Sequence, residues 1–146
     1  MGWTVRPARP EDLPRCAAIE AAAADPWTES QLAEELTSGF GRLFVACRDG
    51  RVEGLAVFQL AAGEASLNAL TVDPAVRRQG AGRALLTGAL AALRAEGAHS
   101  CFLEVRAGNT AARALYESLG FAAAGLRRNF YRNPAEDGVV MALTME

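Results

Sequence analysis

The sequence predicts a single α+β domain over residues 1–146, in which a central mixed, mostly antiparallel sheet is flanked by helices. Two apolar segments on either side of Asp49-Gly50 indicate a hairpin closed by a type I′ turn. The segment from Ser66 to Val105 reads strand, amphipathic helix, strand, which is typical of a right-handed parallel crossover. No repeat, linker or low-complexity tract divides the chain, and its length suits one domain.

The N-terminal half is expected to contain two helices and four strands. Pro10 suits the first turn of a helix, and Thr28-Glu29-Ser30-Gln31 has the pattern of a capping box that begins the second helix. The expected elements are a strand at Trp3–Pro7, a helix from Pro10 to about Ala24, a helix from the capping box to near Gly39, and strands at Leu43–Arg48, Val52–Leu60 and Ser66–Val72.

The C-terminal half is expected to add two helices and three strands. Leu86, Leu90 and Leu93 recur at helical spacing after Gly82, so they define one face of a helix that stops at Gly97. The further elements are a strand at Cys101–Val105, a helix from about Thr110 to Leu119, and strands at Phe121–Leu126 and Val139–Leu143.

The composition is that of an ordinary globular protein. Hydrophobic residues make up 51% of the chain and charged residues 22%, and the formal net charge is −2. This balance gives no general electrostatic reason to bind nucleic acid or an anionic membrane. No apolar stretch is long enough to span a bilayer, and the N-terminus lacks the layout of a secretory signal.

The three cysteines, Cys16, Cys47 and Cys101, are widely spaced and each lies in an apolar run. Buried free thiols are therefore expected rather than a disulfide or a metal site. His99 is the only histidine, has no companion for a triad or a metal centre, and is expected to be structural or solvated. These observations favour a cytoplasmic protein without a metal.

The residues from Val72 to Arg83 join an apolar strand to a helix through a basic loop that contains glycine. The small residues at 80–82 let the main chain approach a ligand closely, and the first turn of the helix offers unpaired N–H groups at the positive end of its dipole. Three arginines add charge of the same sign: Arg77, Arg78 and Arg83. This combination predicts a site for a phosphate or pyrophosphate.

Two other phosphate-binding motifs match this loop poorly. A P-loop would have Lys and Ser or Thr where this chain has Arg83-Ala84. A dinucleotide-binding fingerprint would have a third glycine at Leu85, although Glu104 lies roughly at the expected spacing of about 20 residues. The plainest alternative is a strand–helix turn with surface arginines.

The loop also fits the pattern Arg/Gln-x-x-Gly-x-Gly/Ala, through Arg77, Gly80 and Gly82. This pattern resembles the coenzyme A pyrophosphate loop of the GNAT family of N-acetyltransferases. The resemblance covers nearly the whole chain, and the chain looks most like the bacterial RimI-type ribosomal-protein-alanine N-acetyltransferases. The other matching segments are Pro26-Trp27-Thr28, Leu103 to Asn109, Ala114 to Phe121, Arg127 to Tyr131, and Val140 to Leu143.

The resemblance implies the GNAT-like acyl-CoA N-acyltransferase fold and an enzyme that uses acetyl-CoA as co-substrate. Asn109 would also suit a helix N-cap. The backbone of Leu70 to Val72 would contact the pantetheine and acetyl groups, and one of its N–H groups could hold the oxyanion; the alternative is that these are ordinary apolar strand residues. The coenzyme-binding residues that it implies are Leu70, Thr71, Val72, Arg77, Arg78, Gln79, Gly80, Ala81, Gly82, Arg83 and Asn109.

Glu104 and Tyr116 are the candidate catalytic residues. An α-amino group has a pKa of about 7.7–8.0, so it is largely protonated at pH 7 and must lose a proton before it attacks. The resemblance implies that Glu104 is the general base; its other interpretation is a solvated carboxylate at a strand end. It implies that Tyr116 is the general acid that protonates the departing thiolate; its other interpretation is a core tyrosine on an apolar helix stripe.

The acceptor that the resemblance implies is the N-terminal amine of a small-subunit ribosomal protein that begins with alanine. Arg127–Arg132 and the loop Asn133–Gly138 are expected either to shape the acceptor groove, with Phe130 or Tyr131 as a wall, or to form a polar hairpin with a packed aromatic. The alternatives are a GNAT enzyme that acetylates a lysine side chain or a small-molecule amine, and a non-catalytic sensor of acyl-CoA.

Overall fold

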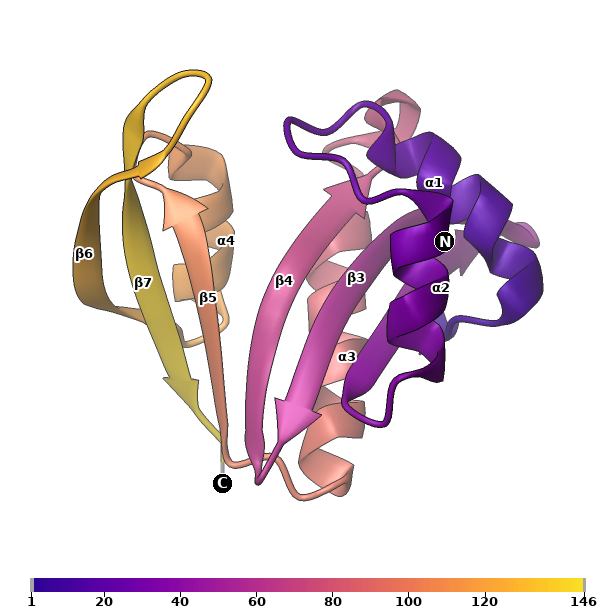
Figure 1. Ribbon diagram of the computed structural model, residues 1–146. Helices are drawn as coiled ribbons and strands as arrows, with labels where there is room; N and C mark the ends of the chain where they lie inside the picture. The colour runs from indigo at the N-terminus through magenta and orange to yellow at the C-terminus, as the bar shows by residue number, and fades with distance from the viewer. Residues whose placement is uncertain (1, 146) are drawn as a thin grey trace.

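A seven-stranded sheet forms the centre of the molecule (Figure 1). The structure is a computed structural model and describes residues 2–145. The spatial order is β1-β2-β3-β4-β5-β7-β6, and only β4 and β5 pair in parallel among the described strands. The mixed, mostly antiparallel sheet is therefore confirmed. The strands are β1 (Thr4–Pro7), β2 (Gly41–Arg48), β3 (Arg51–Ala61), β4 (Glu64–Val72), β5 (Ser100–Arg106), β6 (Ala122–Tyr131) and β7 (Glu136–Thr144).

Helices cover both faces of this sheet (Figure 1). Helices α1 and α2 pack on β3 and β2 from one side, and α3 packs on β1 to β4 from the other. Helix α4 lies on the same side as α3, against the half of the sheet that holds β5 and β7. The helices are α1 (Leu13–Glu20), α2 (Glu29–Thr37), α3 (Ala81–Ala95) and α4 (Thr110–Ser118), with 3-10 turns η1 (Pro10–Asp12) and η2 (Pro74–Val76).

The central strands are buried on both faces. In β3, Ala56, Phe58 and Leu60 belong to the core shared with α3, whereas Leu55 and Val57 belong to the core shared with α1 and α2. Successive side chains of a strand point to opposite faces, so a strand covered on both sides must be apolar at nearly every position. This explains why β2 and β3 appear in the sequence as continuous apolar runs.

The first helix is shorter than the sequence predicts. After η1, α1 ends at Glu20 instead of near Ala24. After Glu20 the chain folds back, and the Glu20 carboxylate accepts a hydrogen bond from the backbone N–H of Trp27. Asp25 does not resume the helix, because a residue that precedes a proline disfavours helical backbone. The connection between α1 and α2 is consequently a loop that lies beside the functional site.

The last two strands are longer than expected. Residues Arg127–Tyr131 belong to β6, whose pairing with β7 continues as far as Tyr131 opposite Glu136. β6 is an edge strand and is exposed along almost its whole length, so its sequence lacks the alternation that marks a strand with one buried face. The connection between the two strands is therefore shorter than the predicted loop.

The parallel pair β4–β5 separates halfway along its length. Glu64 to Leu67 pair with Ser100 to Leu103, and over the described residues the pairing stops there. On the other edge of β4 the register shifts at Asn68, which lacks a partner in β3, so the strand carries a β-bulge at this point. Beyond the bulge, β4 and β5 diverge (Figure 1), and a cleft, the β4–β5 gap, lies between their ends.

The structure also locates the cysteines and the histidine. Cys16, Cys47 and Cys101 are buried free thiols, as predicted. His99 is exposed, and its backbone hydrogen-bonds to Gly63 and Met145. Within residues 2–145 no group of three or more His, Cys, Asp or Glu side chains could hold a metal ion. The same part of the chain contains no helix long and apolar enough to cross a membrane.

Candidate active site

The basic loop lies between the end of β4 and the start of α3. Asp73 begins η2 by accepting a hydrogen bond from the backbone N–H of Ala75 at 2.9 Å, and Arg15 holds the same carboxylate at 2.6 Å. Arg78 and Gly80 adopt left-handed backbone with φ of 63° and 86°. This conformation costs an L side chain energy and is natural only for glycine. The chain therefore reverses tightly before α3 begins.

The start of α3 has no side-chain cap. Gly80 occupies the N-cap position, where a side-chain oxygen would otherwise accept from the first turn. The N–H groups of Ala81, Gly82 and Arg83 therefore have no partner within the helix and lie at the positive end of its dipole. Such a turn suits an anion.

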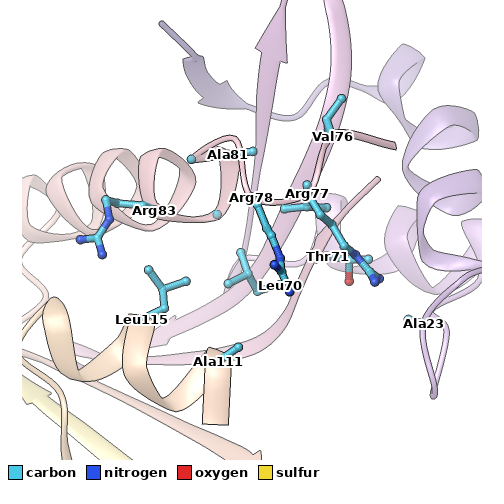
Figure 2. A pocket seen from close by; sticks show the side chains of 13 residues that line it. Ala23, Leu70, Thr71, Val76, Arg77, Arg78, Ala81, Arg83, Ala111 and Leu115 are labelled. Atoms are coloured by element: carbon cyan, nitrogen blue, oxygen red, sulfur yellow. The ribbon is translucent and has the colours of Figure 1, made fainter. Parts of the chain in front are cut away.

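A cleft of about 570 Å³ opens in front of this turn. Figure 2 shows Arg77 and Arg78 extending from the loop over the cleft, while Arg83 lies farther along α3. The Arg83 guanidinium donates to the Ser118 hydroxyl at 2.9 Å, so it links α3 to α4. The cleft is lined by Ala23, Leu70, Thr71, Val72, Val76, Arg77, Arg78, Gly80, Ala81, Gly82, Arg83, Ala111 and Leu115.

The cleft thus brings together the predicted coenzyme residues except Gln79 and Asn109. The side-chain oxygen of Gln79 accepts a hydrogen bond from Arg48, and its backbone oxygen accepts one from the indole of Trp3 at 2.9 Å. Asn109 caps α4 by accepting from the backbone N–H of Ala112 at 3.1 Å, as the alternative interpretation of this residue expected. Asn109 lines a second cleft next to the first.

This second cleft, of about 270 Å³, lies where β4 and β5 diverge. It holds both candidate catalytic residues, and Leu70 lines it as well as the first cleft, so the two spaces meet at this residue. Its lining residues are Ala24, Leu67, Asn68, Ala69, Leu70, Leu103, Glu104, Val105, Arg106, Asn109, Tyr116 and Tyr131.

Glu104 is an accessible carboxylate in this second cleft. Its side chain is 31% exposed, and its carboxylate lies 3.4 Å from Nε of Arg127. The pairing of Glu104 with Val140 of β7 fixes its backbone at the point where β5 leaves β4. A carboxylate in this position is open both to solvent and to a molecule bound in the gap.

Tyr116 is a buried phenol on α4. Its ring packs against Phe121 in an edge-to-face arrangement with centroids 5.8 Å apart. Burial, with smaller effects from Tyr131 and Cys101, raises the pKa of Tyr116 to about 12. The hydroxyl is therefore protonated at neutral pH and can donate a hydrogen bond or a proton into the cleft that Tyr116 lines.

A third cavity, of about 450 Å³, shares Glu104 and Tyr131 with the second cleft and is lined by residues of β4, β5, β6 and β7. Phe130 is 44% exposed there and packs on Tyr131 with ring centroids 5.0 Å apart. Both aromatic rings therefore line this cavity, and their role as a wall of an acceptor groove stays a prediction. Its lining residues are Ser66, Leu67, Asn68, Phe102, Leu103, Glu104, Arg127, Phe130, Tyr131 and Val140.

The connection after Tyr131 is tied to the β5–α4 turn. Glu136 accepts a hydrogen bond from the Gly108 backbone N–H at 2.6 Å and lies 3.3 Å from Arg106. Arg106 also stacks on the ring of Tyr131 at 4.6 Å. These contacts stabilise the end of the β6–β7 hairpin next to the gap.

Sequence reasoning missed several residues of the site. Ala111 and Leu115 line the first cleft, and their spacing of four on one helix was a usable signal. Glu20 is 1% exposed and hydrogen-bonds to Thr71, yet nothing in the sequence distinguishes it from a surface glutamate. Only the folded chain brings such residues to the cleft.

The chain is similar to known proteins. Residues 9–121 match the Acetyltransferase (GNAT) family. The ribosomal protein bS18-alanine N-acetyltransferase of Escherichia coli (strain K12) is 42% identical over 135 residues, which cover 90% of this chain and 90% of that protein. The N-alpha-acetyltransferase RimI of Mycobacterium tuberculosis is 36% identical over 137 residues, or 89% of this chain and 85% of that protein.

A solved structure agrees with these sequence matches. The crystal structure of the ribosomal-protein-S18-alanine N-acetyltransferase from Escherichia coli has a TM-score of 0.91 and 39% identity to this chain, covering 99% of it and 95% of the solved chain. The GNAT-like acyl-CoA N-acyltransferase fold is thereby confirmed. The chain belongs to the GNAT family of acetyltransferases, and it is an acyltransferase.

Proposed function

We propose that the protein transfers an acetyl group from acetyl-CoA directly to the N-terminal α-amino group of a ribosomal protein that begins with alanine. One observation carries the proposal. The cleft at the basic loop and the cleft that holds Glu104 and Tyr116 share Leu70 as a wall, so one extended ligand can reach from the loop to both catalytic candidates.

The coenzyme would bind with its pyrophosphate at the start of α3. The unpaired amides of residues 81–83 and the arginines at 77 and 78 provide N–H donors and positive charge for a diphosphate. The pantetheine arm would then follow β4 from Val72 toward Asn68. That edge of β4 lies beyond the pairing with β5, so its backbone groups are available to amides of the ligand.

Glu104 would act as the general base. An acceptor ammonium that reaches the gap loses its proton to the Glu104 carboxylate, and the free amine then attacks the thioester carbonyl. The carbon–nitrogen bond forms as the carbonyl oxygen becomes an oxyanion, for which a backbone N–H group among residues 70–72, beyond the pairing of β4 with β5, would be the donor.

Tyr116 would act as the general acid. As the tetrahedral intermediate collapses, the carbonyl re-forms, the carbon–sulfur bond breaks and the thiolate of coenzyme A takes the phenolic proton. The nitrogen gives up its remaining excess proton, which restores the phenol, and Glu104 releases the first proton to solvent. At neutral pH the hydroxyl is protonated and is available as the donor. The mechanism uses no cysteine, and among the described residues no cysteine lines the clefts that contain Leu70.

The acceptor class is supported by the relatives. The Escherichia coli protein that is 42% identical to this chain carries a name that states this acceptor, an alanine of ribosomal protein bS18. The cavity beyond Glu104, with its wall of Phe130 and Tyr131, offers space for the residues that follow the acceptor amine. A ribosomal acceptor would place the enzyme in the cytoplasm.

A peptide panel tests the proposal. The purified protein and acetyl-CoA are incubated with peptides that have a free N-terminal alanine, and with matched peptides that are blocked at the N-terminus and contain lysine. Mass spectrometry should show acetylation of the free α-amine. A preference for the blocked peptides would overturn the acceptor assignment, and coenzyme binding without transfer to any amine would indicate a sensor.

A further inference from the structure

A tryptophan near the start of the chain, Trp3, is hydrogen-bonded to the basic loop. The indole Nε1 of Trp3 donates a hydrogen bond to the backbone oxygen of Gln79 at 2.9 Å, across 76 positions of sequence. Trp3 directly precedes β1 and is half-buried. Trp3 is not among the residues that line the first cleft, so it contacts the loop without forming part of the cleft wall.

Arg48 completes this contact. The pairing of Thr4 with Cys47 places the end of β2 beside Trp3, and the Arg48 guanidinium lies over the indole at 4.2 Å from the ring centroid. The same guanidinium donates a hydrogen bond to the side-chain oxygen of Gln79. Trp3 and Arg48, which we call the Trp3–Arg48 clasp, thus bind both the backbone and the side chain of Gln79.

The clasp sets the orientation of one peptide group. The C=O of Gln79 and the N–H of Gly80 belong to the same planar trans peptide, so they point in opposite directions. A hydrogen bond that draws this C=O toward Trp3 therefore turns the N–H of Gly80 away from Trp3. Gly80 lines the cleft, and the nearest atom to a side chain added there would be Trp3 Nε1, at 4.0 Å.

We propose that Trp3 and Arg48 are positioning residues for the coenzyme: they fix the 79–80 peptide so that the loop presents its amides to the pyrophosphate. This inference rests on the proposed use of acetyl-CoA. Without the clasp, a loop with left-handed backbone at Arg78 and Gly80 would sample other arrangements. The ligand would then have to order the loop when it binds, and affinity would fall.

The test compares two acetyl donors. Acetyl-CoA carries the pyrophosphate, whereas S-acetylpantetheine has the same thioester and arm without it. In Trp3→Phe the ring is kept and the N–H is lost, so KM for acetyl-CoA should rise about fivefold, the effect of one neutral hydrogen bond. The kcat with acetyl-CoA and the kcat/KM with S-acetylpantetheine should stay near the wild-type values.

Two further variants make the test decisive. Arg48 lies at the end of β2, and Arg48→Met removes its charge and its hydrogen bond to Gln79. This variant should raise the KM for acetyl-CoA but not for S-acetylpantetheine, even if Trp3→Phe folds poorly. Trp27→Phe replaces the other tryptophan, which lies in the α1–α2 connection, does not line the first cleft and makes no hydrogen bond to Gln79, and it should leave the ratio of kcat/KM between the two donors unchanged. Equal loss with both donors, or no loss with either, in a folded clasp variant would overturn the inference.

Calorimetry with coenzyme A distinguishes this failure from failure of the proposed function. If the wild-type protein does not bind coenzyme A, both proposals fall. If the wild-type protein binds it, and Trp3→Phe and Arg48→Met bind equally well, the acetyltransferase proposal stands and only the role of the clasp is wrong.

Discussion

The hydroxyl of Thr71 donates a hydrogen bond to the buried carboxylate of Glu20, 51 residues earlier in the chain. The other oxygen of that carboxylate accepts from the backbone N–H of Trp27 at 3.1 Å. Glu20 therefore joins the end of α1, the connection to α2, and the strand along which the coenzyme is proposed to lie. The connection supplies Ala23 and Ala24 to the walls of the two clefts.

Replacing Glu20 should destabilise the protein. In Glu20→Ala, the Trp27 N–H and the Thr71 hydroxyl lose their partner in a buried place, so we expect the free energy of unfolding to fall by about 1–3 kcal/mol. Urea unfolding followed by circular dichroism measures this change. In the control Glu34→Ala, on the exposed side of α2, the free energy of unfolding should fall much less. Equal stability of the two variants would contradict a structural role for the buried carboxylate.

Replacing Tyr116 should separate chemistry from binding. In Tyr116→Phe the ring keeps its packing on Phe121 while the proton donor is lost, so turnover should fall by about 10²–10⁴-fold. The Kd for acetyl-CoA, measured by calorimetry, should be nearly unchanged. Turnover equal to that of the wild type would remove Tyr116 as the general acid.

The raised pKa of Tyr116 also predicts an effect of pH on stability. The pKa of about 12 in the folded protein exceeds the ordinary value of 10, so the folded state holds this proton more tightly than the unfolded state. The resulting stabilisation is complete below about pH 10 and is lost as pH rises through 12. Thermal unfolding from pH 8 to 11.5 should therefore show a steeper alkaline decline for the wild type than for Tyr116→Phe. An equal decline with pH in the two proteins would contradict this effect of Tyr116.

Replacing Glu104 should impair deprotonation of the acceptor. In Glu104→Gln the general base is absent, so kcat/KM for the acceptor peptide should fall by about 10²–10⁴-fold at pH 7. The remaining activity should rise with pH as the α-amino group, with its pKa of about 8, loses its proton to water. Initial rates between pH 6 and 9 measure both effects, with Glu117→Gln on the exposed side of α4 as the control. An equal loss in both variants would argue against a specific role for Glu104.

Reversing charge at the loop should weaken coenzyme binding. Arg78→Glu and Arg83→Glu place negative charge beside the proposed pyrophosphate site, so the Kd for coenzyme A should rise at least tenfold, and more at low than at high ionic strength. Arg94→Glu makes the same change in the last turn of α3, far from the cleft, and should leave the Kd almost unchanged. Calorimetry at two salt concentrations distinguishes the variants.

Much of the fold could be predicted because it depends on local physics. The turn at Asp49-Gly50 has positive φ at both residues, as the predicted type I′ hairpin requires. Leu86, Leu90 and Leu93 are buried on one face of α3, as their spacing indicated. The edge strand β6 was predicted too short, because its exposure on both faces leaves no periodic pattern to read. The single-domain organisation stays a prediction.

By itself the sequence determined the strand–loop–helix unit, since the glycine, the arginines and the free helix turn of that unit lie within a dozen residues of one another. Only the tertiary structure decided that β4 and β5 separate after Leu67 and Leu103, that Glu104 and Tyr116 share the resulting cleft, and that Trp3 holds Gln79. These relationships join segments far apart in the chain. They depend on how side chains fill space between packed elements, and no local pattern records that.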